Sequence, residues 1–293
     1  MVPWVDRQEA ILRLLRRQLF FVGGAPRSGT TWLQYLLDSH PEVSCRGEGL
    51  FTKYLAEPLE AMAVTRREAI AAKNETVFRH GSGYPLPDAD DTEFLLGSGV
   101  LLALDRHGAG ENCRAIGEKT PENVFFFARL KTLFPNAKFI GIARDPRDVL
   151  ASAWHFFHQS KPRPDEIAAK TAFISSALSS LDNGARTMFA LTEQYPADCM
   201  VVTYEHMRTA LLPVAVALFH FLGVAHDDAI VAECVARSSF TALSGGRAPG
   251  VALDGSFFRK GVSGDWQTTF TPEMNAMIVN VLGWMFPRFG WTP

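Results

Sequence analysis

The chain has 293 residues, 47% of them hydrophobic and 20% charged, and a formal net charge of −2. This length and composition suit a globular α/β protein with a large core, so we predict a single domain over residues 1–293 and exclude a largely disordered chain. The small net charge excludes an overall basic field that would recruit nucleic acid or heparin-like polymers, so any anion must bind at a local site.

The N-terminal residues 1–17 carry charged side chains throughout and precede the first predicted strand. They contain no apolar core of signal-peptide length, and no stretch of the chain is apolar for the length of a membrane span. We therefore expect no membrane span and a cytoplasmic location. The cysteines are far apart and lack the spacing of a zinc site, so we expect buried free thiols and no metal; they are Cys45, Cys113, Cys199 and Cys234.

The first predicted elements, over residues 19–36, are a strand, a loop and a helix with no spacer between them. The apolar run before the glycines suits a buried strand, and apolar residues recur at helical spacing from Trp32. The amides of residues 27–31 would then point at one spot, where the helix dipole favours an anion. Gly24 and Gly29 have the spacing of the nucleotide-triphosphate P-loop, but Thr30 stands where that motif has lysine. The sequence predicts a loop that holds a phosphate or a sulfate.

The next predicted strand, residues 43–45, is followed by Arg46, Gly47, Glu48 and Gly49. A carboxylate that follows a strand end lies at the carboxyl edge of a parallel sheet, where ligands bind. Glu48 is therefore our candidate general base, and the alternative is a solvated loop glutamate. Residues 55–108 are predicted to be helical in two patches, 58–73 and 91–106, and carry no chemical signature. We interpret them as a variable insertion that covers the acceptor pocket.

Two further predicted strands end in cationic residues. Residues 115–117 lead into Lys119, which would lie at the same sheet edge as the first loop and could reach a transferring group; the alternative is a surface lysine. Residues 137–143 lead into Arg144, after which Asp145 and Pro146 suit the cap and first position of a helix. Ser152 follows two turns later. An arginine fork and a serine hydroxyl suit a phosphate.

The C-terminal half is predicted to contain a long helix over residues 165–193 and a strand over residues 199–203. Tyr204 follows that strand directly. Residues 258–266 place the adjacent cations Arg259 and Lys260 before Gly261 in a glycine-rich loop. Such a loop can wrap tightly around an anion while two cations meet it.

Three of these stretches, in the same order, resemble the anion-binding motifs of the sulfotransferases that use 3′-phosphoadenosine 5′-phosphosulfate (PAPS). Residues 26–32 match the family's 5′-phosphosulfate loop, Pro-Lys/Arg-Ser-Gly-Thr-Thr-Trp. Arg144 and Ser152 match its 3′-phosphate motif, Arg-(x)7-Ser, and residues 259–266 match Arg-Lys-Gly-x-x-Gly-Asp-Trp. The resemblance covers about half of the chain. It implies an α/β fold with a central parallel sheet flanked by helices, the P-loop nucleotide-kinase-like sulfotransferase fold.

The resemblance also implies which residues bind the nucleotide. The 5′-phosphosulfate would be held by the first loop, the 3′-phosphate by the two later motifs, and the adenine by two aromatic rings. The residues for the 5′-phosphosulfate are Arg27, Ser28, Gly29, Thr30 and Thr31. Those for the 3′-phosphate are Arg144, Ser152, Arg259, Lys260 and Gly261, and the rings for the adenine are Trp32 and Tyr204.

For catalysis, Lys119 matches the lysine that the family has at this point, immediately after a short strand, but Pro121 replaces the histidine base of the cytosolic enzymes. Tyrosylprotein and several bacterial sulfotransferases resemble this chain in having a glutamate after the first helix, which favours Glu48 as base. His155 and His158 are the alternatives. Lys119 and Arg27 would stabilise the developing charge without a metal.

Two other functions stay open: a P-loop kinase of a small metabolite that needs ATP and magnesium, and a nucleotide-binding regulator without catalysis. The small net charge favours a small-molecule acceptor over a highly sulfated polymer. Several aromatic residues would suit an apolar acceptor or could belong to the core; they are Phe51, Tyr84, Phe125, Trp154 and Phe157. The dimerisation pattern of the cytosolic enzymes is not visible, so the oligomeric state is open.

Overall fold

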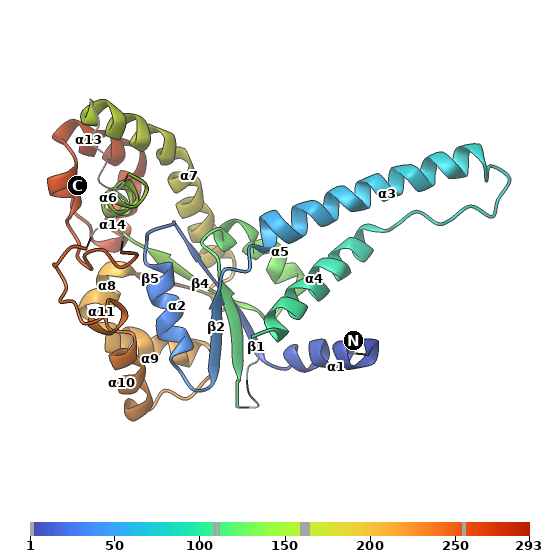
Figure 1. Cartoon of the computed structure of the whole chain (residues 1–293), viewed down its shortest axis with the longest axis horizontal. Coiled ribbons are helices and arrows are strands. Elements are labelled where there is room, and N and C mark those ends of the chain that lie inside the picture. The colour runs from blue at the N-terminus through green and yellow to red at the C-terminus, as the bar shows by residue number, and fades with distance from the viewer. Residues whose placement is uncertain (1–2, 108–109, 111, 159–164, 254–255) are drawn as a thin grey trace.

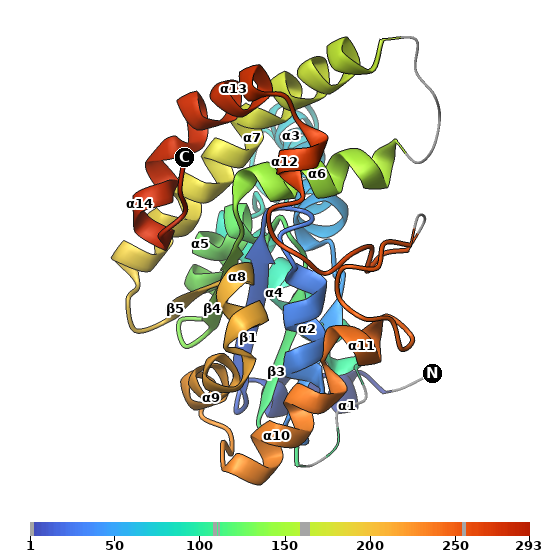
Figure 2. The ribbon, with the colours of Figure 1, turned by 90° about the vertical axis from the view of Figure 1, so that its left-hand side faces the viewer.

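A five-stranded parallel sheet forms the centre of the molecule (Figures 1 and 2). The computed structural model describes residues 3–107, 110, 112–158, 165–253 and 256–293. The strand order is β2-β3-β1-β4-β5. The strands are β1 (Gln18–Gly24), β2 (Val43–Gly47), β3 (Ala115–Lys119), β4 (Lys138–Ala143) and β5 (Cys199–Thr203). The predicted central parallel sheet is confirmed.

Helices cover both faces of this sheet, because alternate residues of the buried strands point to opposite sides. Phe20 and Val22 of β1 pack against one group of helices: α2 (Thr30–Asp38), α8 (Tyr204–Thr209), α9 (Leu211–Phe221) and α10 (Asp228–Arg237). Leu19 and Phe21 pack against α4 (Ala89–Asp105), α5 (Asn123–Leu133) and α7 (Glu166–Gln194). The result is a three-layer α/β fold.

A third apolar cluster joins α6 (Pro146–Phe157) and α7 to α13 (Pro272–Leu282) and α14 (Phe286–Phe289). The remaining elements are α1 (Trp4–Leu14), η1 (Thr52–Ala56), α3 (Glu57–Thr76), α11 (Phe240–Leu243), α12 (Trp266–Thr269) and η2 (Gly283–Met285). The predicted start of α6 is confirmed, since the Asp145 side chain accepts a hydrogen bond from the Arg147 amide and Pro146 is the first helical residue.

The predicted insertion forms an arm, built from α3, a connecting segment and the start of α4, that projects from the sheet (Figure 1). No residue of α3 is buried, whereas the second half of α4 contributes five buried residues: Leu96, Gly97, Val100, Leu101 and Leu104. Arg129 of α5 ties the base of the arm to the body through ion pairs with Glu60 and Glu93. The two predicted helices are confirmed, and that the segment covers an acceptor pocket stays a prediction. Gly108, the end of the predicted insertion, lies outside the described residues.

Candidate active site

The loop between β1 and α2 has the conformation that its glycines predict. Gly29, the residue before α2, has a φ of 105°, and a Cβ at that position would lie 2.8 Å from the ring of Tyr204. Thr30 and Thr31 begin the helix, so their amides have no partner within it and can donate to an anion. The Ser28 amide instead donates to the carbonyl of Ala25 at 3.0 Å. Ser28 thus contributes to the turn of the loop through its amide.

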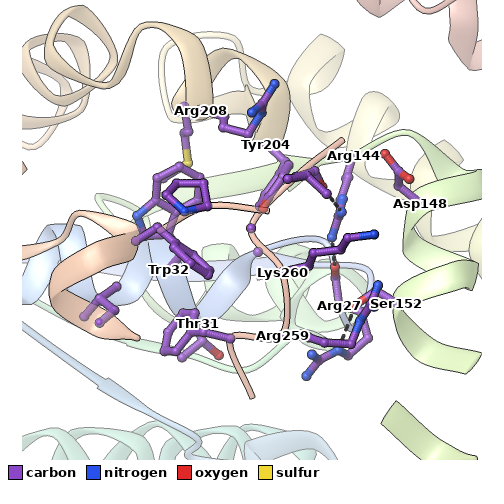
Figure 3. Close-up of a pocket in the computed structure, with 18 of the residues that line it drawn as sticks. Arg27, Thr31, Trp32, Arg144, Asp148, Ser152, Tyr204, Arg208, Arg259 and Lys260 are labelled. Atoms are coloured by element: carbon purple, nitrogen blue, oxygen red, sulfur yellow. Dashed lines mark hydrogen bonds between the residues drawn. The ribbon is translucent and has the colours of Figure 1, made fainter. Parts of the chain in front are cut away.

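A cavity of about 350 Å³ lies beside this loop (Figure 3). Every predicted nucleotide-binding residue except Ser28 lines it: Arg27, Gly29, Thr30, Thr31, Trp32, Arg144, Ser152, Tyr204, Arg259, Lys260 and Gly261. These residues come from stretches of sequence up to 234 positions apart, since Arg27 and Gly261 are both among them. The structure therefore brings the three motifs to one place.

Arg27 lies between two aromatic rings at one end of the cavity. Its guanidinium carbon is 4.3 Å from the ring centre of Phe156 and 4.5 Å from that of Phe257. Its Nε donates to the Ser152 hydroxyl at 3.4 Å, and its Nη2 donates to the Phe257 carbonyl at 3.0 Å. Burial, followed by repulsion from Arg144 and Arg259, lowers the pKa of Arg27 to about 10. The side chain is thus still a cation at neutral pH, and its orientation is fixed.

Arg144 connects the phosphate loop to the glycine-rich loop. Its Nη1 donates to the carbonyl of Arg27 at 3.2 Å and its Nη2 to the carbonyl of Val262 at 3.0 Å, while its guanidinium lies 4.1 Å from the ring centre of Tyr204. Its Nε is buried and has no hydrogen-bond partner among the described residues. That donor is available to a ligand.

Asp148 is a cavity residue that the sequence interpretation did not identify. It lies on α6, four residues after Arg144, which precedes the helix, and four residues before Ser152, with which it shares a helix face. Its carboxylate accepts from the amides of Gly264 at 2.7 Å and Trp266 at 3.2 Å. Burial raises the pKa of Asp148 above its ordinary value. Asp148 therefore fastens the glycine-rich loop to the helix, and its spacing from Arg144 and Ser152 was the available signal.

Asp265 is a second cavity residue to which the sequence interpretation gave no role, although it lies within the glycine-rich motif. One carboxylate oxygen pairs with Arg259, and the other accepts from Lys260 Nζ at 2.5 Å. Burial alone would raise the pKa of Asp265, but the hydrogen bonds from Lys260 and Arg259 outweigh it, so the pKa lies below its ordinary value. The two predicted phosphate-binding cations thus share one counter-ion. Gly261 follows them with a φ of 65°.

The other end of the cavity is aromatic. The rings of Trp32 and Tyr204 meet edge to face at 5.4 Å, and Trp32 Nε1 donates to the Ser238 carbonyl at 2.7 Å. Phe240 also lines this region, and burial raises the pKa of Tyr204. A planar base suits these rings, since aromatic pairs favour offset or edge contacts.

Two of the three predicted catalytic residues, Glu48 and Lys119, form an ion pair. Lys119 Nζ donates to Glu48 Oε1 at 2.5 Å. Lys119 is the last residue of β3, beside Val22 of β1 and Gly47 of β2, so the pair lies at the sheet edge from which the phosphate loop leaves. The Lys119 side chain is 4% exposed and that of Glu48 is 41% exposed. Neither lines the 350 Å³ cavity.

The remaining candidates divide between core and surface. His158 stacks on Trp154 at 4.0 Å, and His155 lies 3.3 Å from the Thr269 hydroxyl, so both contact structural residues of α6 and α12. Phe51 and Trp154 are buried in the core, whereas three other aromatic candidates are exposed: Tyr84, Phe125 and Phe157. The four cysteines are buried free thiols, as predicted.

The described residues contain no group of three or more His, Cys, Asp or Glu side chains placed to hold a metal ion. Among those same residues, none of the helices combines the length and the apolar character needed to cross a membrane.

Comparison with known proteins relates the chain to sulfotransferases. Protein-tyrosine sulfotransferase 2 of Gallus gallus is 27% identical over 219 residues, which are 73% of this chain and 53% of that protein. Protein-tyrosine sulfotransferase 1 of Danio rerio is 26% identical over 233 residues, covering 77% of this chain and 59% of that protein. The chain thus spans between one half and three fifths of the length of these curated relatives.

Solved sulfotransferase structures share the fold. Mouse sulfotransferase SULT7A1, complexed with 3′-phosphoadenosine 5′-phosphate (PAP), superposes with a TM-score of 0.56 at 18% identity, over 98% of this chain and 91% of that one. Sulfotransferase STF9 from Mycobacterium avium also superposes with a TM-score of 0.56, at 15% identity, over 99% of this chain and 81% of that one. The predicted P-loop sulfotransferase fold is confirmed. Because the model of the sulfotransferase family also matches residues 20–228, well over half of the sequence, the chain belongs to the sulfotransferase family.

Proposed function

We propose that this protein transfers the sulfuryl group of PAPS to a hydroxyl or amine of an acceptor. The observation that carries the proposal is the cavity, in which five cations lie beside an aromatic end. The cations are Arg27, Arg144, Arg208, Arg259 and Lys260. PAPS has a matching distribution of charge, with a phosphosulfate and a 3′-phosphate attached to one adenosine.

The residues present fit such a nucleotide. The buried Nε of Arg144, a residue that lines the cavity, has no partner among the described residues, so it has a hydrogen bond to offer. The charge-assisted bonds of an arginine to a phosphate are among the strongest that proteins form. We assign Arg27 and the amides of Gly29, Thr30 and Thr31 to the 5′-phosphosulfate. Arg144, Ser152, Arg259, Lys260 and Gly261 are assigned to the 3′-phosphate, and Trp32 and Tyr204 to the adenine.

Glu48 is the proposed general base. It takes the proton of the acceptor group as the new oxygen–sulfur or nitrogen–sulfur bond forms and the bond from sulfur to the 5′-phosphate oxygen breaks. Its 41% exposure leaves the carboxylate accessible to an acceptor, and its partner Lys119 is placed to stabilise charge on the transferring group. Arg27 supports the leaving phosphate oxygen. No step in this scheme calls on a metal ion.

For the acceptor we propose a phenol or another hydroxyl of a small molecule. The exposed rings of Phe125 and Phe157 offer apolar contacts on the body of the protein. The relatives named protein-tyrosine sulfotransferases make a tyrosine side chain of a peptide the second candidate. A cytoplasmic location stays part of this proposal.

Calorimetric titration with 3′-phosphoadenosine 5′-phosphate (PAP), in parallel with ATP and magnesium, tests the nucleotide assignment. We expect tight binding of PAP alone. Binding of ATP alone would overturn the proposal in favour of the kinase, whose P-loop lysine is replaced here by Thr30. Labelled PAPS with p-nitrophenol and a tyrosine-containing peptide then separates the enzyme from a regulator that binds the nucleotide without turnover.

A further inference from the structure

Glu118 is a buried acid that the proposed chemistry does not use. It precedes Lys119 on β3 and is 2% exposed. Its Oε2 accepts hydrogen bonds from the Gly49 amide at 3.1 Å and the Thr120 hydroxyl at 2.9 Å, and its Oε1 accepts from Asn123 Nδ2 at 2.6 Å. The side chain thus connects β3 and the start of α5 to the residue that follows Glu48.

These hydrogen bonds compensate for an unfavourable location. Burial raises the pKa of Glu118, while the bonds from Asn123, Gly49 and Thr120 act in the opposite direction. An acid without such donors would be strongly destabilising at this depth. The converse also holds, since the Gly49 amide depends on Glu118 for its acceptor.

The segment that Glu118 contacts has an unusual backbone. Leu50 has a φ of 51°, in the left-handed region that non-glycine residues rarely adopt, and its amide donates to the Thr120 hydroxyl at 3.3 Å. A Cβ on Gly49 would lie 2.7 Å from the ring of Phe51. Such a conformation persists only where the surroundings over-determine it. Glu118 and Thr120 provide the acceptors for the two amides that follow Glu48.

We propose that Glu118 is a positioning residue of the transfer site: through Gly49 and Thr120 it fixes the turn of residues 48–50, and so keeps the Glu48 carboxylate beside Lys119. The effect on turnover rests on the proposed function of Glu48, whereas the fixing of the turn does not. The two parts can therefore be tested separately.

Glutamine cannot replace Glu118 without loss. If its oxygen takes the place of Oε2, its amide group faces the Asn123 Nδ2 donor. If its oxygen takes the place of Oε1, its amide group faces the Gly49 N–H. Asn123 cannot simply turn over, because its Nδ2 also donates to the Val22 carbonyl at 3.1 Å. Glu118→Gln thus disrupts the network at nearly constant volume.

Hydrogen exchange, followed by mass spectrometry of peptides that cover residues 46–56, tests the fixing of the turn. We expect exchange at Gly49 and Leu50 to become roughly threefold to tenfold faster in Glu118→Gln, as expected for one lost hydrogen bond. Thr120→Val, which removes the acceptor of the Leu50 amide, should act in the same direction. Unchanged exchange in both variants would overturn the proposal.

Glu205→Gln is the matched control. Glu205 is a partly buried glutamate with a raised pKa, and it accepts from the Asp145 amide at 3.1 Å, but it follows β5 at the other side of the sheet. Its substitution should leave exchange in residues 46–56 unchanged. Equal acceleration in this control would show general loosening and would count against a specific role of Glu118.

Transfer from PAPS to p-nitrophenol tests the effect on the reaction. Glu48→Gln should lower kcat by about 10²–10⁴, and Glu118→Gln should lower kcat with little change in the KM for PAPS. In the double variant the Glu118 substitution should have little further effect, since its target is gone. A full additional loss in the double variant would refute action through Glu48. If Glu48→Gln itself is harmless, the proposed base falls, while the exchange result on the turn still stands.

Discussion

At the scale of single residues, the cations of this site already have partners in the folded chain. Arg259 and Lys260 pair with Asp265, and Lys119 pairs with Glu48. Long cationic side chains lose considerable rotamer freedom when a ligand fixes them. Because these cations are fixed beforehand, part of that entropy is lost in folding and not in binding.

Arg144→Ala should weaken PAP binding by about 10-fold to 100-fold, the range for a lost hydrogen bond to a charged group. The effect on 5′-AMP, which lacks the 3′-phosphate, should be much smaller, because Arg144 is assigned to that phosphate. Calorimetry of both ligands measures the difference. Arg288→Ala is the control, since Arg288 stacks on Phe189 outside the cavity. Equal losses for PAP and AMP would exclude Arg144 from the 3′-phosphate.

At the scale of elements, α6 organises the nucleotide side of the site with one face. Arg144 lies two residues before the helix, while Asp148 and Ser152 lie on it four residues apart and share one helix face; all three line the cavity. The first and last of them face the phosphates in our proposal. The middle one holds the glycine-rich loop, through the amides of Gly264 and Trp266.

Asp148→Asn should make stability less dependent on pH. The folded chain holds the Asp148 proton more tightly than the unfolded chain, because burial raises this pKa above 3.8. The bound proton therefore stabilises the folded chain relative to the unfolded chain below pH 3.8. This stabilisation is lost as pH rises through the pKa that Asp148 has in the folded chain. Asparagine cannot ionise, so the variant should gain stability relative to the native protein as pH rises from about 4 upward. Urea unfolding at several pH values measures this, and a constant difference would contradict the raised pKa.

Motifs with a local signature could be predicted from the sequence. The phosphate loop, the cap of α6 and the cation pair Arg259 and Lys260 depend on neighbouring residues, and the structure gathers their side chains around one cavity. The partners of these motifs could not be predicted in the same way. The contact of Glu118 with Gly49 joins residues 69 positions apart and leaves no periodicity in the sequence. Only the fold brings such pairs together.

At the scale of the whole molecule, the arm stands apart from the rest (Figure 1). The sequence predicted its two helices, because helical spacing is local, but not their direction. α3 has no buried residue, so it has no apolar face that would show from the sequence which way the helix packs. The contacts at the base of the arm, such as the ion pair of Arg129 and Glu93, are made by charged residues. In the sequence such residues look the same as charged residues that face only solvent, so they do not predict the contact.

Removal of residues 68–86, with a short Gly-Ser linker in their place, should leave the fold and the nucleotide site intact. Arg67 Nη1 donates to the Pro87 carbonyl at 2.9 Å, so the cut ends lie close together. Because no buried residue is lost from α3, the thermal midpoint should change by less than about 3 °C. PAP affinity should stay within about twofold. A large fall in either would contradict the separation of arm and body, and a higher KM for p-nitrophenol alone would support a role of the segment at the acceptor pocket.

The central position of β1 has a kinetic consequence for the proposed reaction. β1 lies between β3, which ends in Lys119, and β4, which leads into Arg144. In the proposed assignment Arg144 binds the nucleotide and Lys119 lies beside the acceptor, so the two substrates would approach the transferring group from different sides of β1. In that arrangement neither substrate has to leave before the other can enter, so both could be bound at once and the sulfuryl group would pass directly between them. Initial rates measured against both substrates should then give intersecting double-reciprocal lines, without the parallel lines of an enzyme that stores the group on itself.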